Sequence, residues 1–559
     1  MNNPIDADVI IIGAGFAGLA AALRIKDTNQ GLPAEKQLTY VVLEADAQRL
    51  GGRAWTRDGV DMDFGGGYIG ATQTQIQYLV RRYQVQTIET FLPQDRNFKW
   101  LYQNGKNEFT RFPGDNPLAF PGGLNALSLL LKLDGFAIEV RDHLADPTLS
   151  ALAYLDTKTV ADWINEQRAE WDAHPVPVDP SDPNIGVGIS ADTAEVFVTS
   201  VRSAFSLEPS EVSMFFLLYY AATAGGYSSL VDVSGGTGAA EATRFALGTQ
   251  SLVEAIRQDI DPNNKTVLRG ARATKIAYDA SGVVVTCDVT GADGNVTQRS
   301  LRGRRAIVAM APPVSINRLS YDPPLEKGDG ASVMRYELCQ AMGKALGRTI
   351  KGFVRFERPF WRERGLMGFL LSAGLPITEN PLDWTLDNVW VDPSGNEPDR
   401  YSLMTFIVGA SASHWSEKHT KAERARAVIA HLKRVYRFEN SELLNPSDPE
   451  SNYVEEDWPQ QCVNGLGAPD AMMPPGALTQ FGSALRTPIG PIHWAGAESS
   501  TEWCGYMNGA IESGFRAASE AVRAVLSGAA GASGAGEGPD DQPPRGTTPP
   551  AGVAPKKAA

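Results

Sequence analysis

A glycine-rich turn near the N-terminus constrains the fold more than any other feature of the sequence. Residues 7–12 (ADVIII) are continuously apolar, which is typical of a parallel strand that is buried on both faces. The turn that follows carries Gly13, Gly15 and Gly18 in the pattern GxGxxG and leads into an alanine-rich helix. A second apolar strand over residues 38–43 completes a predicted β-α-β unit.

This unit has the properties of a dinucleotide-binding site. Its glycines let the backbone approach a pyrophosphate at the N-terminus of the helix. Glu44 ends the second strand, 26 residues beyond Gly18, and a carboxylate there can accept hydrogen bonds from ribose hydroxyls. A glycine-rich turn in an unrelated α/β protein is the alternative, but here the strand, the helix and the acidic residue occur in the order that a dinucleotide site requires.

Two further glycine clusters follow along the chain. RLGGRAWT contains Gly52 and Arg53, and the arginine can neutralise phosphate charge. MDFGGGYIG contains Gly66 and Gly67 and permits another close approach of the backbone. An enzyme that binds only NAD rarely needs these additional clusters, whereas a flavin dinucleotide lying across the sheet does. The sequence therefore favours a flavin cofactor.

Charge and composition argue against several classes of function. A formal net charge of −14 disfavours nucleic acid or an anionic membrane surface as a partner. The cysteines form no CxxC pair and the histidines no ligand-spaced cluster, so we expect neither a disulfide framework nor a metal site. No stretch reaches the ~18–20 apolar residues of a transmembrane helix, and no signal sequence precedes the first strand. We therefore expect a cytoplasmic protein with no membrane partner.

The rest of the chain alternates between helical and extended patterns. Residues 85–229 are mostly helical in pattern, and residues 349–356 and 401–408 favour strands. After about residue 527 the composition shifts to Gly, Ala, Pro and Ser. Such a segment cannot bury a core, so we expect residues 528–559 to be a disordered tail.

A series of motifs is spread over residues 7–526. They are VIIIGAGFAGLAAA, VVLEA, GGRAWT, DFGGGYIGATQ, EVSMFFLLYYAATAGG, AIVAMAPP, IKGFVRFERPFWRE, MPPGALTQFGSALRTP and HWAGAESSTEWCGYMNGAIESGFRAA. This set resembles the flavin-containing amine oxidase family, and within it the monoamine oxidases. The resemblance implies FAD and the oxidation of a small-molecule amine to an imine by hydride transfer to flavin N5. O2 would regenerate the flavin and give H2O2.

The resemblance also implies an architecture. It is an α/β fold of two domains, like that of p-hydroxybenzoate hydroxylase, with a Rossmann-like FAD-binding domain and an α+β substrate domain built on a mixed sheet. We expect the discontinuous FAD-binding domain to comprise residues 5–84, 235–310 and 441–527. The substrate-binding domain, which is partly helical, would comprise residues 85–234 and 311–440.

By the same resemblance, FAD is expected to contact all three glycine clusters and the C-terminal motif. The implied contact residues are Gly13, Gly15, Gly18, Glu44, Gly52, Arg53, Gly66, Gly67, Ala273, Gly496, Glu498, Gly505 and Met507. Gly505 and Met507 would begin a helix whose N-terminal amides stabilise negative charge on the reduced flavin. An ungapped count from MPPG places Ala468 where animal monoamine oxidases carry the cysteine that links the flavin. Cys462 lies six residues earlier and could take that role only if the loop were shifted by a large distance. We therefore expect FAD to be noncovalent.

Two residues are expected to act in catalysis. Lys351 interrupts an apolar strand and occupies the position of the family's flavin-proximal lysine. A water bridging this lysine to flavin N5 would satisfy a costly buried charge and assist oxygen activation; the alternative is a lysine that reaches solvent from the end of the strand. Tyr506 matches the family's tyrosine that faces the flavin, where its ring would guide the amine. Cys504, close to it, is expected to be a small packing residue.

The implied substrate pocket departs from the family in one place. The ungapped count places Pro469 where the family has a second aromatic ring, so half of the usual aromatic cage is expected to be missing. The other implied pocket residues are apolar or aromatic, as a ligand cavity requires. They are Tyr68, Leu230, Val231, Trp384 and Phe406. Asp232, next to this set, is expected to be a surface carboxylate.

These positions favour a monoamine with an apolar or aromatic body. An L-amino-acid oxidase must pair the substrate carboxylate with an arginine, which Arg202 or Arg244 would have to supply. Polyamine oxidases need carboxylates along a tunnel, and no acidic run is visible near the pocket positions. A flavin-binding interaction protein without redox activity is a further alternative, against which the retained Lys351 and Tyr506 argue. A homodimer is suggested by the resemblance alone.

Overall fold

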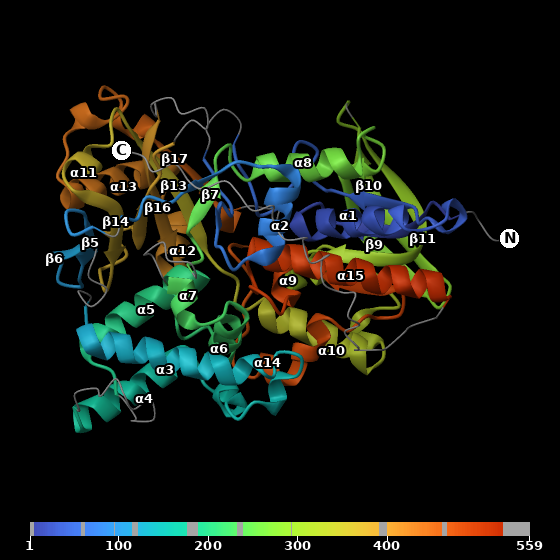
Figure 1. The fold of residues 1–559 in the computed structure, drawn as a ribbon, viewed down its shortest axis with the longest axis horizontal. Coiled ribbons are helices and arrows are strands. Elements are labelled where there is room, and N and C mark those ends of the chain that lie inside the picture. The colour runs from blue at the N-terminus through green and yellow to red at the C-terminus, as the bar shows by residue number, and fades with distance from the viewer. Residues whose placement is uncertain are drawn as a thin grey trace, which may run out of the picture.

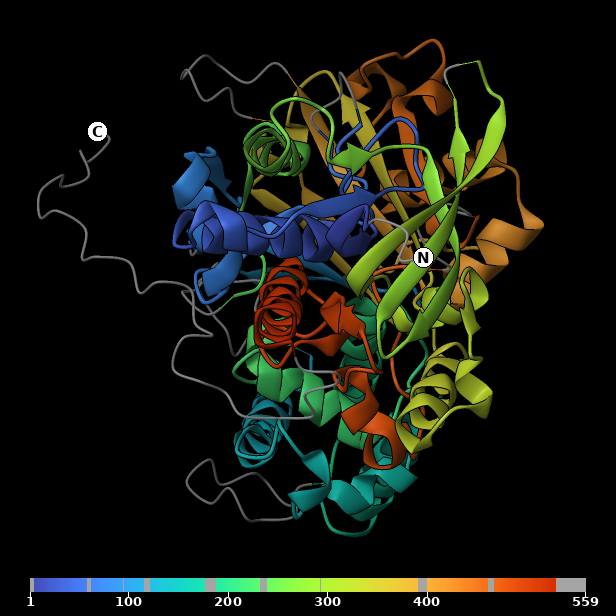
Figure 2. The same ribbon diagram turned by 90° about the vertical axis from the view of Figure 1, so that its right-hand side faces the viewer.

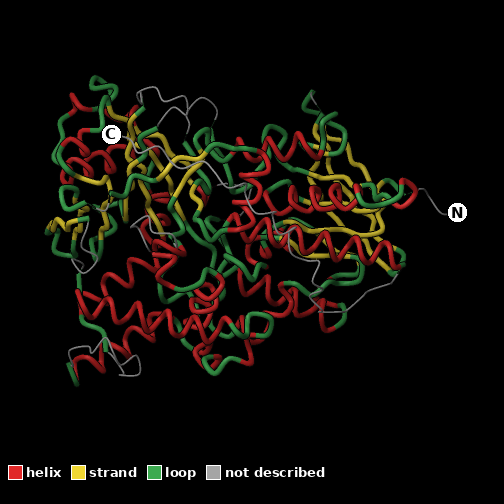
Figure 3. Tube along the Cα trace, viewed as in Figure 1, coloured by secondary structure: helices red, strands yellow, loops and turns green. Residues whose placement is uncertain are grey.

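The fold combines two large sheets with a layer of helices that runs along one side of the molecule (Figure 1). The computed structural model describes residues 5–57, 62–93, 95–114, 121–175, 188–231, 239–291, 293–390, 400–460 and 467–528. Strands gather in two separate regions, and helices fill the space below and beside them (Figure 3).

Among the described residues, eight strands form the first sheet around a parallel centre. β1 (Ala7–Ile12) lies between β2 (Tyr40–Leu43) and β11 (Val296–Ala309) and pairs in parallel with both. The other strands are β8 (Val267–Leu268), β9 (Ala271–Asp279), β10 (Gly282–Thr290), β12 (Ser320–Asp322) and β18 (Ile492–Ala495). Because β1 has neighbours on both sides and nearly all of its residues are buried, its continuous apolar pattern has a direct structural cause.

Two long helices pack against each other beside this sheet (Figures 1 and 2). They are α1 (Phe16–Gln30) and α15 (Met507–Ser527), and their buried faces consist largely of alanine and glycine. A Cβ atom on Gly514 would lie 2.2 Å from the carbonyl oxygen of Ala17. Small residues therefore allow the two helix backbones to approach closely, which holds the N-terminal and C-terminal motifs side by side.

The second sheet has seven strands within the part of the chain that the structure describes. Its order is β17 (Tyr453–Asp457), β13 (Thr349–Phe356), β16 (Tyr401–Val408), β15 (Trp384–Asp387), β14 (Leu366–Ser372), β5 (Lys99–Gln103) and β6 (Phe109–Pro113). Three helices belong to this region: α11 (Phe360–Glu363), α12 (Gly409–Lys418) and α13 (Lys421–Tyr436). Apolar residues of α13 share one core with β13 and β16.

A layer of helices lies along the lower side of the molecule in the view of Figure 1. Its helices are α3 (Gly123–Arg141), α4 (Val160–Ala173), α5 (Ala191–Phe205), α6 (Met214–Thr223), α7 (Tyr227–Val231) and α14 (Ala477–Phe481). Every residue of α6 is buried, which explains why the aromatic run from Met214 to Tyr220 carries no polar face. The remaining helices are α2 (Thr74–Tyr83), α8 (Gln250–Ile260), α9 (Pro312–Asn317) and α10 (Gly330–Met342).

A third, smaller sheet has three strands within the described residues. β7 (Thr243–Phe245) pairs with β3 (Tyr68–Ile69) on one side and with β4 (Thr87–Glu89) on the other. Tyr68 and the residues just before β7 are thereby brought to one place. This placement becomes important for the site described below.

The predicted α/β fold with two domains is confirmed, and β1, β13 and β16 have the predicted bounds. The domain ranges stay a prediction, although strand pairing does not follow them everywhere. β12 belongs to the first sheet and β17 to the second, whereas the boundaries predicted near residues 311 and 441 would assign them the other way. The predicted disordered tail lies, from residue 529, outside the described residues. No helix of the described ranges is both long and apolar enough to cross a membrane.

Candidate active site

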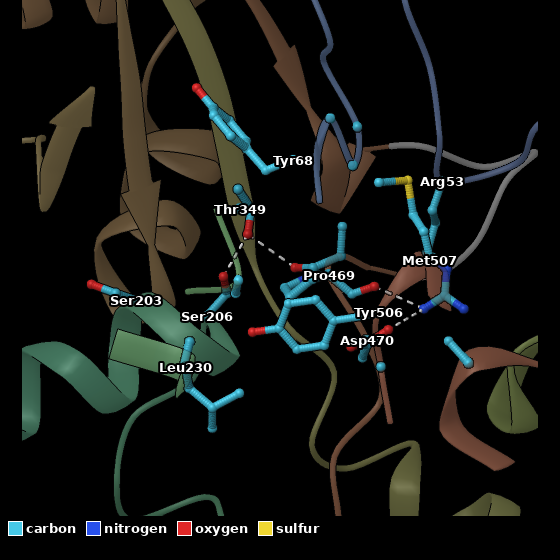
Figure 4. A pocket seen from close by; sticks show the side chains of 18 of the residues that line it. Arg53, Tyr68, Ser203, Ser206, Leu230, Thr349, Pro469, Asp470, Tyr506 and Met507 are labelled. Atoms are coloured by element: carbon cyan, nitrogen blue, oxygen red, sulfur yellow. Dashed lines mark hydrogen bonds and ion pairs between the residues drawn. The ribbon is translucent and has the colours of Figure 1, made fainter. Parts of the chain in front are cut away.

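A cavity of about 820 Å³ extends from the first glycine turn to the second sheet. Its volume lies within the range of cofactor and ligand pockets. Nearly all the residues predicted for the cofactor, the substrate and catalysis line it, and Figure 4 shows part of this lining. Gly18 and Glu498 are the two predicted site residues that are not among the lining residues.

The first glycine turn has the geometry that close backbone approach requires. Gly13 has a φ of +103°, and a Cβ atom there would lie 2.7 Å from the carbonyl oxygen of Ala309. A Cβ atom on Gly18 would lie 1.8 Å from the carbonyl oxygen of Gly13. Gly18 therefore permits α1 to pack on the turn, while Gly13 and Gly15 line the cavity at the N-terminus of α1.

Glu44 stands at the carboxyl end of β2, where it was predicted. Its carboxylate accepts hydrogen bonds from the backbone N–H groups of Ala14 (2.9 Å) and Asp46 (2.8 Å). Burial raises the pKa of Glu44 above its ordinary value, and these two hydrogen bonds oppose the shift. Glu44 and Ala273, on β9, line the same end of the cavity, which suits the ribose and adenine of a dinucleotide.

Arg53 lines the cavity, and its guanidinium is paired with carboxylates of the C-terminal part of the chain. Its guanidinium donates to Glu498 Oε1 (2.8 Å), Asp470 Oδ1 (2.9 Å) and the carbonyl oxygen of Pro469 (2.8 Å). Burial alone would lower the pKa of Arg53, but the two carboxylates raise it above its usual value. Arg53 therefore links the second glycine cluster to the C-terminal motif. Glu498 forms this ion pair although it is not among the residues that line the cavity.

Asp470 is a site residue that the sequence analysis missed. It is buried, it follows Pro469 directly, and the hydroxyl of Tyr220 lies 3.4 Å from its Oδ2 atom. Burial and the neighbouring Glu498 raise the pKa of Asp470 above its ordinary range, against the influence of Arg53. A carboxylate at this position has no local sequence pattern, so only its place directly after Pro469 could have drawn attention to it.

The third glycine cluster and the start of α15 pack against each other and both line the cavity. A Cβ atom on Gly66 would lie 3.1 Å from Met507 Sδ, and one on Gly67 would lie 2.6 Å from the Cβ of Asp63. Gly505 has a φ of +83°, and a Cβ atom there would lie 2.2 Å from Asp470 Oδ2. Larger side chains at these positions would clash with protein atoms, so the glycines allow the segments that line the cavity to pack closely.

Lys351 lies on β13 and is 5% exposed. Its Nζ atom donates to the carbonyl oxygen of Gly65 (2.8 Å) and lies 5.4 Å from the ring centroid of Phe406. Burial lowers the pKa of Lys351 to about 8, while Asp63 and Glu241 favour the charged form. The alternative of a lysine that reaches solvent from a strand end is therefore wrong.

Tyr506 is the N-cap residue of α15, and its side chain lines the cavity next to Pro469 (Figure 4). The rings of Trp503 and Tyr220 contact it, with centroids 4.9 and 5.9 Å away. The Tyr220 ring is tilted by 44° to that of Tyr506, so it does not form a parallel second wall. Pro469 lines the cavity on the side of the Tyr506 ring (Figure 4).

Aromatic and aliphatic side chains form the other walls of the cavity. The rings of Trp384 and Phe406 stack at 3.7 Å with an interplanar angle of 4°. Tyr68 lies nearby, and its buried hydroxyl has no hydrogen-bond partner among the described residues. Leu230 and Val231, at the end of α7, line the same cavity. The predicted pocket residues are thus brought together.

Glu241 also lines this part of the cavity, and the sequence analysis missed it. Burial raises the pKa of Glu241 to about 7, and Lys351 partly opposes the shift. The sequence shows no acidic run near the pocket positions, yet this single carboxylate lines the cavity with them. Glu241 lies in an ordinary-looking loop before β7, and only the pairing of β7 with β3 brings it beside Tyr68.

The remaining candidates lie away from the cavity or outside the described residues. Arg202 is paired with Asp383 (2.7 Å), Arg244 donates to Asn388 and to the carbonyl of Val389, and neither arginine lines the cavity. Cys504 is a buried thiol whose Sγ atom contacts the carbonyl oxygen of Glu498 (3.6 Å), as expected of a packing residue. Asp232 and Cys462 lie outside the described residues.

Comparisons with known proteins agree with this geometry. The profile of the flavin containing amine oxidoreductase family matches residues 16–522. A probable flavin-containing monoamine oxidase A of Dictyostelium discoideum is 29% identical over 525 residues, which cover 92% of this chain and 97% of that protein. The solved structure of cyclohexylamine oxidase from Brevibacterium oxydans IH-35A covers 94% of this chain and 100% of its own, with a TM-score of 0.72 and 28% identity.

Putrescine oxidase in its wild-type form bound to putrescine is a second structural relative. It covers 92% of this chain and 99% of its own, with a TM-score of 0.73 and 25% identity. The family profile spans nearly the whole described fold and includes the second and third glycine clusters and the start of α15. The chain is therefore a member of the flavin-containing amine oxidoreductase family, an oxidoreductase that acts on amines with a flavin cofactor.

Proposed function

We propose that the protein oxidises a primary or secondary amine with an apolar or aromatic body. The product would be an imine that hydrolyses to an aldehyde and ammonia or an amine. FAD, held without a covalent bond, would accept the hydride, and O2 would take up the electrons to give H2O2. The observation that carries this proposal is that the buried Lys351 and Tyr506 line one cavity together with Tyr68, Trp384 and Phe406.

The residues along the cavity fit an FAD molecule. Gly13 and Gly15 at the N-terminus of α1 would hold the pyrophosphate, and Glu44 would hold the ribose. Gly66, Gly67 and Gly505 line the cavity and would present their backbone to the flavin, and the N-terminus of α15 would favour negative charge beside Met507. The flavin supplies the acceptor for a hydride, and every other function falls to side chains of this chain.

Lys351 and Tyr506 would have separate tasks. The ammonium of Lys351 is fixed by Gly65 and lies among aromatic rings, where a positive charge favours the reduction of O2 to anionic species. The ring of Tyr506 would bound the path along which the amine approaches. Because Pro469 replaces a second ring, the substrate would have more room on that side than an aromatic cage allows.

A noncovalent cofactor is supported by the residue at the position of the linking cysteine. Ala468 lines the cavity, and its backbone is held by hydrogen bonds to Gly347 (3.0 Å) and from Thr349 (3.0 Å). An alanine side chain cannot form a thioether. Acid precipitation of the purified protein is therefore expected to release all of the flavin, as FAD, into the supernatant. Flavin that remains in the protein pellet would contradict a noncovalent FAD.

An amino-acid oxidase is the second candidate, and the arginines disfavour it. Arg53, Arg272 and Arg318 are the arginines among the described lining residues of the cavity. Arg53 is already paired with two carboxylates. Arg272 lies on β9 next to Ala273, and Arg318 directly follows α9, so both are away from Lys351 on β13. A substrate carboxylate near Tyr506 would thus lack a bidentate partner.

A panel of substrates tests these alternatives. Tyramine, phenylethylamine, hexylamine, putrescine and several L-amino acids would be supplied anaerobically, and bleaching of the flavin absorbance would be followed. We expect bleaching by the aromatic and alkyl monoamines and, after oxygen is admitted, an equal amount of H2O2. Bleaching by amino acids alone would favour the second candidate. If no compound bleaches the flavin, the protein is a flavin-binding interaction protein and the proposal is wrong.

A further inference from the structure

One carboxylate at the substrate end of the cavity has no structural partner. Among the described lining residues, the carboxylates are Glu44, Glu241 and Asp470. Glu44 accepts two backbone hydrogen bonds, and Asp470 accepts one from Arg53. The carboxylate of Glu241 has no hydrogen bond within the described residues; Glu241 is partly exposed, it lines the cavity, and burial desolvates its carboxylate enough to raise its pKa. A buried carboxylate without a partner is costly unless a ligand supplies one.

The backbone around Glu241 is held by hydrogen bonds on three successive residues. The carbonyl oxygen of Ala240 accepts from Gln73 Nε2 (3.4 Å), and that of Glu241 accepts from Thr90 Oγ1 (2.6 Å). The carbonyl of Ala242 accepts from the backbone N–H of Thr90 (3.0 Å). The segment is thereby held to the N-cap residue of α2 and to the residue after β4, which keeps the Cα of Glu241 at the cavity wall.

The ionisable groups that face Glu241 come from three elements. Lys351 of β13 interacts with it electrostatically, as do Tyr68 of β3 and Tyr506 at the start of α15. Asp63 acts on Lys351 from the other side. Tyr506 is the residue proposed above to bound the path of the amine, and Lys351 is the one proposed to act beside the flavin. Glu241 therefore shares the space that the amine nitrogen would occupy.

We propose that Glu241 binds the substrate in its ammonium form and accepts the proton that the nitrogen must lose before oxidation. In this step R–CH2–NH3⁺ and the Glu241 carboxylate become R–CH2–NH2 and the Glu241 carboxylic acid. One N–H bond breaks, one O–H bond forms, and no electrons are transferred. The inference rests on the proposed function, since it assigns a residue and an ionisation state of the substrate to the same site.

The need for such an acceptor follows from the chemistry of amines. Hydride loss from the α-carbon requires the nitrogen lone pair, yet an alkylamine with a pKa of about 10.4 is only roughly 0.04% neutral at pH 7. Glu241 is placed to convert the abundant ammonium form inside the cavity. The transfer also removes two opposite charges from an apolar space, which desolvation favours.

Lys351 indicates how strongly the cavity affects a primary ammonium. The pKa of Lys351 is lowered to about 8, and that of Glu241 is raised to about 7. A substrate ammonium in this cavity would also lose solvation, which lowers its pKa. The difference in pKa between donor and acceptor would then be smaller than about 6, the ordinary difference between an amine and a glutamate.

The pH dependence of kcat/KM in a Glu241→Gln variant tests the proposal. For the wild-type protein with phenylethylamine, we expect kcat/KM to rise through about pH 7 and then to stay level up to the pKa of the amine. In Glu241→Gln only the neutral amine reacts, so kcat/KM should rise about tenfold per pH unit up to that pKa. With an amine pKa of about 10.4, the loss should be roughly 600-fold at pH 7.5 and less than about threefold at pH 10.5.

The control is Glu166→Gln, which makes the same change in charge on α4 at a residue that is not part of the cavity lining. Its profile should match the wild type. If Glu241→Gln lowers kcat/KM by one constant factor at every pH, Glu241 only shapes the cavity and the proposal is wrong. The proposal is equally wrong if Glu241→Gln loses only diamines, because Glu241 would then hold a second, distant ammonium.

Binding gives a readout that does not depend on turnover. α,α-Dimethylbenzylamine has no α-hydrogen and cannot be oxidised, and α,α-dimethylbenzyl alcohol is its uncharged counterpart. By calorimetry of the flavin-loaded protein at pH 8, we expect Glu241→Gln to weaken the amine at least about tenfold and the alcohol less than about twofold. Equal effects on both ligands would overturn the proposal. The proposed function itself fails only if no amine bleaches the wild-type flavin, so the two failures are distinguishable.

Discussion

A single buried cation dominates the electrostatics next to the proposed flavin position. Lys351 loses the solvation that normally stabilises its charge, and this lowers its pKa to about 8, while Asp63 and Glu241 act in the opposite direction. The lysine is therefore charged below about pH 8 and neutral above it. Any step that uses its positive charge should follow the same titration.

Lys351→Met is expected to slow reoxidation of the flavin by O2 at least about tenfold, because an electrostatic contribution to the reduction of O2 is lost. Anaerobic reduction by the substrate should change less than about threefold. The rate of reoxidation in the wild type should fall as the pH rises through about 8, and the variant should show no such dependence. Stopped-flow absorbance measures both half-reactions. Lys351→Arg keeps the charge and serves as the control; an unchanged O2 rate in Lys351→Met would contradict this role.

Gly505 is a second residue whose identity is imposed by its surroundings. Its φ is +83°, and a Cβ atom would lie 2.2 Å from Asp470 Oδ2 and 2.5 Å from the hydroxyl of Tyr220. Gly505→Ala is therefore expected to lower the free energy of unfolding by about 2–4 kcal/mol in a urea titration. Gly135→Ala on α3 meets open space and should be neutral or stabilising by up to ~1 kcal/mol. Equal stabilities of the two variants would contradict this interpretation.

At the scale of elements, the contact between α1 and α15 joins the two ends of the fold. A Cβ atom on Gly514 would lie 2.2 Å from the carbonyl oxygen of Ala17 and 3.0 Å from the Cβ of Ala20. Gly514→Ala gains helix propensity but pushes the helices apart, and we expect a net loss of about 1–3 kcal/mol. Gly330→Ala, at the start of α10, gains the same propensity without a clash. The midpoint of chemical unfolding compares them, and a more stable Gly514→Ala would show that the helices have room.

The pattern of apolar residues predicted most helices and strands, because the residues that an element buries are apolar along its own length. β13 and β16 are covered on both faces, so their apolar runs mark their bounds directly. β2 begins at Tyr40 and not at Leu38, since the backbone of Leu38 is bound by the side chain of Asn29 through two hydrogen bonds of 2.8 Å. A side chain that binds backbone N–H and C=O groups in this way competes with strand pairing. The apolar pattern of the sequence does not reveal it.

The site was predictable where a motif or an unusual residue marks it. The glycine turns and Glu44 belong to one contiguous β-α-β unit, and Lys351 is conspicuous in an apolar strand. Glu241 and Asp470 have no such mark. Glu241 reaches the cavity only through the pairing of β7 with β3, and Asp470 becomes a buried carboxylate only because Arg53, more than 400 residues earlier, lies beside it. Long-range placement of this kind is not encoded in local pattern.

At the scale of the whole molecule, the cavity lies between the two sheets, so a bound cofactor joins them. Gly13 and Glu44 at one end belong to the first sheet and its turns, while Lys351 and Phe406 at the other belong to the second. A ligand that contacts both ends binds only the folded protein. Its binding therefore stabilises the fold by mass action, by about 4 kcal/mol at a thousandfold excess over Kd.

This predicts a ranking of flavins in thermal melting of the apoprotein. FAD spans the cavity and should raise the melting temperature most, FMN should raise it less, and riboflavin should have little effect because it lacks the groups that meet Gly13 and Glu44. Glu44→Gln keeps one acceptor oxygen for the backbone but loses the charge. It should weaken FAD about tenfold or more and leave FMN unchanged, since FMN lacks the adenosine ribose. Equal stabilisation by FMN and FAD would mean that the first glycine turn does not hold the dinucleotide.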